Sequence, residues 1–132
     1  MDCFIPNKNT CKKVLIPPSK SYAQRAILAA SLCEEAVLLS NLGKSADVRY
    51  FLTMSKQLGA NHQAEQDGAL LIQGFQNQRS PQLNAGESGL GLRLITSICA
   101  VLGSAYEIIG EGSLKQRPIV EFEHILTQIG VS

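Results

Sequence analysis

Apolar residues near the start of the chain alternate between short continuous runs and helix-like spacing. The run 13–16 is β-prone and ends at two consecutive prolines, which cannot continue a hydrogen-bonded ladder. An Ala- and Leu-rich stretch over 22–33 predicts a helix, with either Ser19 or Ser21 as its N-cap. The apolar run 36–39 then predicts a buried strand.

A second helix is predicted where apolar residues return at helical spacing. Ser45 is its expected N-cap, and Asp47 lies in its first turn, where a carboxylate complements the positive end of the helix dipole. Gly59 is expected to end this helix. The side chains expected to form its apolar stripe are Val48, Phe51, Leu52 and Leu58.

A hairpin completes the first predicted unit. Asp67 and Gly68 form a strong turn signal between the β-prone runs 62–66 and 69–73. The region 13–74 therefore has the predicted order β-α-β-α-β-β.

The second half of the chain repeats this order without a closing hairpin. It predicts a strand, a helix, a strand and a helix, in that order, at 81–84, 92–102, 105–109 and 118–129. We therefore interpret 80–132 as an incomplete second unit. The predicted fold class is α/β of the mixed, α+β-like kind, with one complete βαβαββ unit and one partial unit.

The balance of charge narrows the classes of partner. The 132 residues include 12 basic and 11 acidic side chains, which leave a net charge of +1. This balance argues against a nucleic-acid partner and against a polybasic membrane patch. The apolar runs are far shorter than the roughly 20 residues that span a bilayer, and the first residues lack the apolar region of a secretory signal. We expect a cytoplasmic protein with no membrane or nucleic-acid partner.

The cysteines indicate neither a disulfide framework nor a zinc site. They are scattered along the chain, without a C-x-x-C pair and without histidines at ligand spacing. We expect reduced thiols, with slow chemical reaction at Cys33 and Cys99, which lie in apolar helical stretches, and fast reaction at Cys3.

A candidate anion site lies at the start of the first predicted helix. A helix N-terminus offers free N–H groups and a partial positive charge. Lys20 and the Ser21 hydroxyl are expected there, and Arg25 follows one turn after Ser21 on the same face. This cluster suits a phosphate and a carboxylate together. From these residues alone, an ordinary capped helix with a solvated lysine and arginine is slightly favoured over a binding site.

Two further segments also place bare backbone or a cation at the start of a helix. The glycine-rich stretch 86–91 contains Gly89 and precedes Arg93, and its glycines allow a ligand to approach the backbone closely. Arg117 immediately precedes a helix that begins with Pro118. A tight strand-to-helix turn and an exposed loop arginine are the alternatives.

The three segments together carry a family resemblance. They read P-P-S-K-S-x-x-x-R, G-x-S-G-x-x-x-R and G-x-G-S-L-K-Q-R-P-I, in this order. This pattern resembles the enolpyruvyl transferase family, and most closely its EPSP synthase branch. The resemblance extends over residues about 12–131. It implies a fold built from βαβαββ units.

The resemblance also implies a reaction and a set of roles. Members of the EPSP synthase branch transfer the enolpyruvyl group of phosphoenolpyruvate to the 5-hydroxyl of shikimate 3-phosphate and release phosphate, without a metal or an organic cofactor. By match to the family motifs, Lys20 contacts both substrates, and Ser21 and Arg25 hold shikimate 3-phosphate. Gly89 gives phosphoenolpyruvate close backbone contact, and Arg117 binds its phosphate. No residue of this chain matches a family acid or base, so the catalytic residues are unknown.

The chain also departs from the family pattern. Glu87-Ser88-Gly89-Leu90 stands where the family has Asn-Ala-Gly-Thr, and a carboxylate there repels phosphate unless it faces a cation or solvent. Family members are longer and have two domains, so we expect an N-terminal part whose partner is the C-terminal remainder of the same chain, and which is inactive alone. The alternatives are a UDP-N-acetylglucosamine enolpyruvyl transferase-like protein and a non-catalytic anion-binding or structural fragment.

Overall fold

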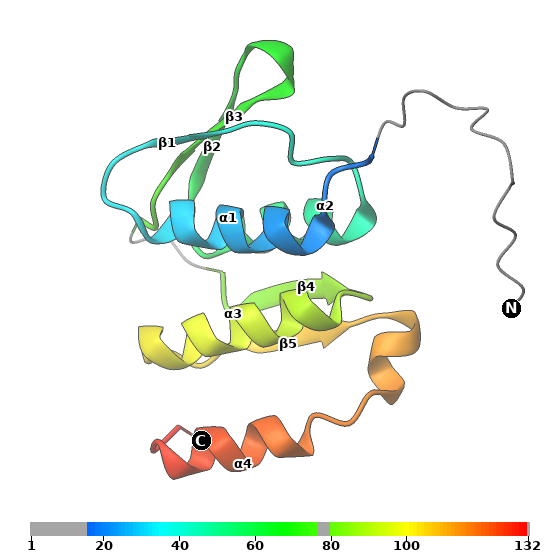
Figure 1. Ribbon diagram of the computed structural model, residues 1–132. Coiled ribbons are helices and arrows are strands. Elements are labelled where there is room, and N and C mark those ends of the chain that lie inside the picture. Colours follow the sequence, from blue (N-terminus) through cyan, green and yellow to red (C-terminus); the bar gives the residue numbers. More distant parts are fainter. Residues whose placement is uncertain (1–15, 77–79, 132) are drawn as a thin grey trace, which may run out of the picture.

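The computed structural model describes residues 16–76 and 80–131, and these form a mixed α/β fold (Figure 1). The mixed class predicted from the sequence is therefore confirmed. The predicted strand at 13–16 lies outside the described residues, apart from Ile16. The elements in chain order are α1 (Lys20–Leu32), β1 (Val37–Leu39), α2 (Ala46–Gln57), β2 (Asn61–Ala64), the 3₁₀ turn η1 (Gln66–Gly68), β3 (Leu70–Gln73), β4 (Gln82–Gly86), α3 (Gly89–Leu102), β5 (Glu107–Gly110), the 3₁₀ turn η2 (Gly112–Gln116) and α4 (Val120–Gln128).

The first sheet is antiparallel and has the strand order β1-β3-β2. The predicted hairpin joins β2 to β3, and its turn places Asp67 and Gly68 in the left-handed region at φ 55° and 74°. The prediction of a buried strand at 36–39 is wrong in one respect. β1 forms, but it is an edge strand, and the side chain of Leu38 is 60% exposed.

The second sheet consists of β4 and β5, which run parallel. Both strands therefore end on the same side of the molecule, at the right of Figure 1. β4 ends at Gly86, whose φ of 55° turns the chain sharply toward α3. The division of the chain into one complete and one partial βαβαββ unit stays a proposal.

A serine begins each of the first three α-helices. The side-chain oxygens of Ser19, Ser45 and Ser88 accept hydrogen bonds from backbone N–H groups three residues later, at 3.5, 3.3 and 3.0 Å. Ser19, rather than Ser21, is therefore the N-cap of α1. All four α-helices begin on the same side of the molecule, at the right of Figure 1.

The core lies where α1 and α2 pack on each other and on the two sheets. α1 contacts β3, and α2 contacts β4. The predicted apolar stripe of α2 is confirmed, because Val48, Phe51 and Leu58 are buried and Leu52 is half-buried. Each fully buried side chain of this size stabilises the fold by about 1.5–3 kcal/mol. The remaining core residues are Ala23, Ile27, Ala30, Met54, Ala60, Ile72, Leu83, Ala85, Ile95, Cys99 and Leu114.

A half-buried histidine makes stability depend on pH. Burial lowers the pKa of His62 from 6.5 to about 4, and the charge of Lys56 adds to this effect. The unfolded chain therefore takes up a proton between these two values that the folded chain does not. We expect the free energy of unfolding to fall, by at most about 3 kcal/mol, as the pH drops from 6.5 toward 4, and to change little through this group above 6.5.

Urea unfolding across this pH range measures the effect. The His62→Gln variant should lose this part of the pH dependence. The matched control is His124→Gln at an exposed position of α4, which should keep it. Equal pH dependence in the wild-type protein and His62→Gln would contradict the assignment.

The two described cysteines differ in exposure, which corrects one expectation. Cys33 is exposed at the end of α1, whereas Cys99 is buried in α3. Burial raises the pKa of the Cys99 thiol to about 11, so little thiolate forms at neutral pH. In peptide mapping after brief alkylation of the native protein, Cys33 should therefore be labelled quickly and Cys99 slowly. Equal labelling in the native state would contradict the packing of α3.

Candidate anion-binding site

Several helix starts and strand ends meet on one side of the molecule. α1 and α3 begin there, and β4 and β5 end there (Figure 1). Helix N-termini carry free N–H groups and a partial positive charge, and ligands of α/β proteins bind at the carboxyl ends of parallel strands. This side is therefore the candidate site.

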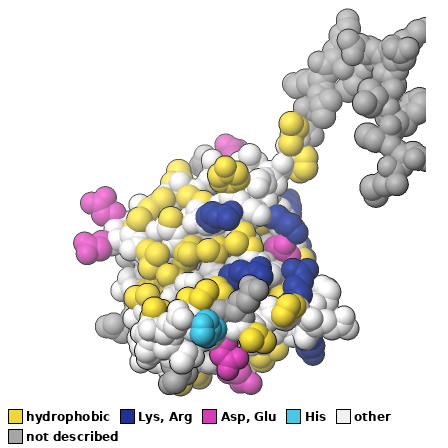
Figure 2. All heavy atoms as spheres, turned by 60° about the horizontal axis from the view of Figure 1, so that its bottom comes forward, with side chains coloured by type: hydrophobic (Ala, Val, Ile, Leu, Met, Phe, Trp, Pro, Cys, Tyr) yellow, Lys and Arg dark blue, Asp and Glu magenta, His cyan; other side chains and the backbone are white. Residues whose placement is uncertain are grey.

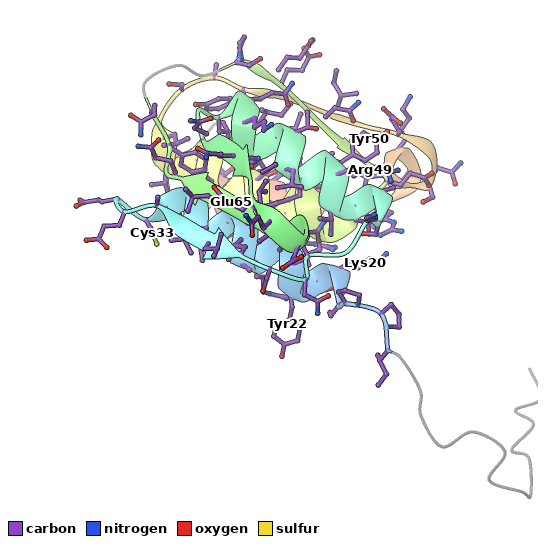
Figure 3. All side chains as sticks on the ribbon, turned by 90° about the horizontal axis from the view of Figure 1, so that it is seen from above. Lys20, Tyr22, Cys33, Arg49, Tyr50 and Glu65 are labelled. Carbon is purple, nitrogen blue, oxygen red and sulfur yellow. The ribbon has the colours of Figure 1, made fainter. Side chains whose placement is uncertain are left out.

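Lys20 forms an ion pair across two of these helix starts. Its Nζ lies 2.6 Å from Oδ2 of Asp47 in the first turn of α2. Figure 3 shows Lys20 at the end of α1 that lies beside the start of α2. Because 62% of the Lys20 side chain is exposed, this pair contributes little to stability, and an anion in solution can reach the ammonium group.

The other two residues predicted on α1 contact each other. Nη1 of Arg25 donates a hydrogen bond to the backbone carbonyl of Ser21 at 3.3 Å, as their one-turn spacing allows. Arg25 is exposed and Ser21 is half-buried. The neighbouring Tyr22 points away from the body of the molecule in Figure 3 and is not part of this cluster.

Gly89 and Arg117 are brought together at the start of α3. A Cβ atom added to Gly89 would lie 2.6 Å from Nη1 of Arg117 and 3.8 Å from Nη1 of Arg93. Two guanidinium groups therefore lie over the first turn of α3, where the lack of a side chain on Gly89 leaves room for them. The predicted residues thus form two groups, one at each helix start.

The unusual carboxylate of Glu87 points toward η2. It accepts hydrogen bonds from the backbone N–H of Ser113 at 3.1 Å and from its hydroxyl at 2.9 Å. These hydrogen bonds, together with the smaller effect of the Arg117 charge, lower the pKa of Glu87. Glu87 therefore anchors the turn that precedes Arg117, so its charge is satisfied by donors of the protein.

A polar network that the sequence did not predict lies beside this site. The Glu111 carboxylate accepts hydrogen bonds from the Asn84 amide at 2.7 Å and from the Tyr50 hydroxyl at 2.9 Å. The Tyr50 ring covers Gly86, where an added Cβ atom would lie 2.4 Å from the ring. This network fixes α2 to the ends of β4 and β5. Its members are far apart in sequence, and no local signal pairs them.

The buried side-chain amide of Gln24 was also not predicted from the sequence. Nε2 of Gln24 lies 2.7 Å from Oγ of Ser88 and 3.2 Å from the backbone oxygen of Asp47. Gln24 is 1% exposed and Ser88 is 2% exposed. The Ala/Leu-rich pattern of α1 predicted a helix, but it gave no reason to expect a buried glutamine with partners on two other helices.

An apolar groove extends from Gly89 and Arg117 along the space between α3 and α4. Its volume is about 600 Å³, and its walls include Leu92, Phe122 and Leu126. Figure 2, in which the α4 side comes forward, shows hydrophobic side chains beside a group of Lys and Arg side chains. The groove thus has a cationic end and apolar walls.

Metal-binding clusters and membrane-spanning helices are absent from the described part of the chain. No group of three or more His, Cys, Asp or Glu residues in it could hold a metal ion. None of its helices is long and apolar enough to cross a membrane.

Comparison with known proteins decides the family. A family model for EPSP synthase (3-phosphoshikimate 1-carboxyvinyltransferase) matches residues 6–132. The chain belongs to the EPSP synthase family. The resemblance read from the three motifs is therefore confirmed, and it is favoured over the UDP-N-acetylglucosamine enolpyruvyl transferase alternative.

Individual relatives agree with the family assignment. The chain is 35% identical over 118 residues to a 3-phosphoshikimate 1-carboxyvinyltransferase of Clostridium perfringens. The matched region covers 87% of this chain and 28% of the relative. The chain is also 34% identical over 120 residues to the 3-phosphoshikimate 1-carboxyvinyltransferase of Methanopyrus kandleri, with 87% and 28% covered. The chain thus spans little more than a quarter of the length of these relatives.

A solved structure agrees on the fold. EPSP synthase from Acinetobacter baumannii superposes with a TM-score of 0.76 at 21% identity, covering 90% of this chain and 28% of that one. At this identity the likeness establishes the fold alone. The EPSP synthase-like fold predicted from the motifs is confirmed.

The network around Glu111 generates a prediction. The hydrogen bond to Glu111 and its negative charge raise the pKa of Tyr50. The Glu111→Gln substitution removes that charge, so we expect the pKa of Tyr50 to fall toward 10 in an NMR titration of the tyrosine rings. The control is Glu107→Gln, which replaces an exposed carboxylate of β5 that accepts a hydrogen bond from Gln82. An unchanged Tyr50 pKa in Glu111→Gln would contradict the network.

Proposed function

We propose that this chain is the N-terminal part of an EPSP synthase and supplies part of its substrate-binding site. The reaction is the transfer of enolpyruvyl from phosphoenolpyruvate to the 5-hydroxyl of shikimate 3-phosphate, with release of phosphate, in the shikimate pathway to aromatic amino acids. One observation carries the proposal: the cations of the three family motifs lie at helix starts on one side of the molecule. Both substrates are polyanions, which such a side attracts.

The proposed roles divide between the two groups of residues. Lys20, Ser21 and Arg25 bind shikimate 3-phosphate, and Lys20 also reaches phosphoenolpyruvate. The exposed Arg25 guanidinium and the largely exposed Lys20 ammonium support these roles, because both are accessible to a ligand. Gly89 and Arg117 bind phosphoenolpyruvate, and the position of the Arg117 guanidinium over the start of α3 supports this assignment.

The Lys20–Asp47 ion pair gives the free site a defined state. Asp47 holds the Lys20 ammonium beside the N-terminus of α1 before any ligand arrives. A bound phosphate then competes with the Asp47 carboxylate or shares the ammonium with it, since an ammonium group has three donors. Because the pair is exposed and weak, the Lys20 ammonium can turn from Asp47 toward a ligand.

The proposed activity belongs to a longer protein. Binding and orientation are the steps that the described residues can perform, and the catalytic acid and base are unknown. Glu87 and Glu111 are held by hydrogen bonds within the protein and have lowered pKa values, so neither is a suitable proton donor at neutral pH. We infer that this chain alone does not turn over the substrates and requires the C-terminal remainder as its partner. The cytoplasmic location and the absence of a cofactor also stay predictions.

Titration with shikimate 3-phosphate tests the proposed site. Addition of this ligand should shift the backbone amide signals of residues 19–25 in NMR spectra of the chain. A charge-assisted hydrogen bond contributes about 1.5–3 kcal/mol, so Lys20→Ala and Arg25→Ala should each weaken binding by roughly ten- to a hundredfold.

The matched control is Lys56→Ala, which removes an exposed lysine from the last turn of α2, at the opposite end of that helix from Asp47. This variant should bind as the wild-type protein does. Signal changes confined to other regions, or equal weakening in all three variants, would contradict the assignment.

A further inference from the structure

The candidate site consists of two clusters on different helices. We define the α1 cluster as Lys20, Ser21 and Arg25, and the α3 cluster as Gly89, Arg93 and Arg117. Each cluster is held by local contacts: Arg25 donates to the Ser21 carbonyl, and the Arg117 guanidinium lies over Gly89. These local contacts do not determine how the two clusters sit relative to each other. That relation depends on groups buried between the helices.

One side-chain amide connects the helix starts. Nε2 of Gln24 donates to the Ser88 hydroxyl at 2.7 Å and to the backbone carbonyl of Asp47 at 3.2 Å. The Ser88 oxygen also accepts the N–H of Gly91 at 3.0 Å and so caps α3. The two hydrogens of a single NH2 group thus reach the first turn of α2 and the N-cap of α3.

The connecting residues lie next to both clusters. Gln24 follows Lys20 by one helical turn, and both side chains contact Asp47, through its carbonyl and its carboxylate. Ser88 immediately precedes Gly89. A displacement of α3 relative to α1 would therefore break the Gln24–Ser88 hydrogen bond before it changed either cluster internally.

Burial makes this connection costly to break. Gln24 is 1% exposed and Ser88 is 2% exposed, so water does not replace a lost partner. An unpaired buried polar group loses its full hydration without compensation, which costs more than the net gain of an ordinary exposed hydrogen bond. The arrangement with both hydrogen bonds formed is therefore strongly preferred.

We propose that Gln24 and Ser88 are positioning residues that lock the α1 cluster to the α3 cluster, so that an anionic ligand that reaches both clusters meets them at a fixed spacing. The identity of this ligand rests on the proposed function, whereas the positioning role does not. Neither residue contacts a ligand, since both are buried. Their effect is transmitted through the placement of Lys20 and Gly89.

The ligand test compares the affinities for two probes, since the ratio of the two affinities does not depend on the fraction of folded protein. The probes are phosphoenolpyruvate and shikimate 3-phosphate, titrated singly into the chain. In the proposed function phosphoenolpyruvate contacts both clusters, whereas shikimate 3-phosphate contacts the α1 cluster alone. In Gln24→Met, which keeps the side-chain length but loses both hydrogen bonds, the affinity for phosphoenolpyruvate should fall roughly fivefold or more, while the affinity for shikimate 3-phosphate stays within about threefold.

Three further variants separate positioning from general damage. Ser31→Ala removes a buried hydroxyl of the same helix whose hydrogen bond, 2.8 Å to the Ile27 carbonyl, is local, and it should keep the wild-type ratio. If Gln24→Met does not fold, Ser88→Ala and Ser88→Thr decide. Ser88→Ala should weaken phosphoenolpyruvate binding relative to shikimate 3-phosphate binding, and Ser88→Thr, which retains a hydroxyl, should keep the wild-type ratio.

A ligand-free measurement keeps this inference separate from the proposed function. Residual dipolar couplings of α1 and α3 amides should fit one rigid body in the wild-type protein and in Ser31→Ala, but not in Gln24→Met. If the wild-type protein binds neither probe while this result holds, the proposed function fails and the positioning role stands. A single rigid body in Gln24→Met overturns the inference, whether or not the ratio of the two affinities changes.

Discussion

The starts of α1, α2 and α3 must meet on one side of the molecule, because the amide of Gln24 hydrogen bonds to groups on both of the other helices. Its partners are the carbonyl of Asp47 and the hydroxyl of Ser88, and all of these groups lie at or near helix N-termini. With α2 packed on β4, and β4 leading directly into α3, the ends of the parallel strands fall on the same side. The concentration of helix dipoles and cations there follows from this arrangement, and an anion-binding surface is its chemical consequence.

Local signals were sufficient for much of the fold. Ser45 and Gly59 marked the two ends of a helix with an apolar stripe, and the Asp67-Gly68 turn predicted the hairpin. Both predictions succeeded because capping and turn geometry depend on a few adjacent residues. The exposure of Leu38 and Cys33 was predicted wrongly. Whether the edge of a sheet or the end of a helix is covered depends on distant parts of the chain, which a local pattern does not describe.

The motif residues could be named from the sequence, but the groups that hold them could not. Gln24 and Ser88 are 64 residues apart, and Tyr50 and Glu111 are 61 residues apart. Glu87 illustrates the same limit. As a sequence departure it was expected to repel phosphate unless it faced a cation or solvent, and in the structure its carboxylate is engaged by both donors of Ser113 and stabilises the turn before Arg117. The Glu87 carboxylate therefore stabilises the fold locally, and this role is visible only in the tertiary contacts.

A crystal structure of this chain with shikimate 3-phosphate would show most directly whether the side of the molecule where the helices begin binds the anionic substrates. We predict that the phosphate group lies within hydrogen-bonding distance of the Lys20 ammonium and the Ser21 hydroxyl, with the Arg25 guanidinium turned toward the ligand. A ligand bound on another face, with the Lys20–Asp47 ion pair and Arg25 unchanged, would contradict this prediction.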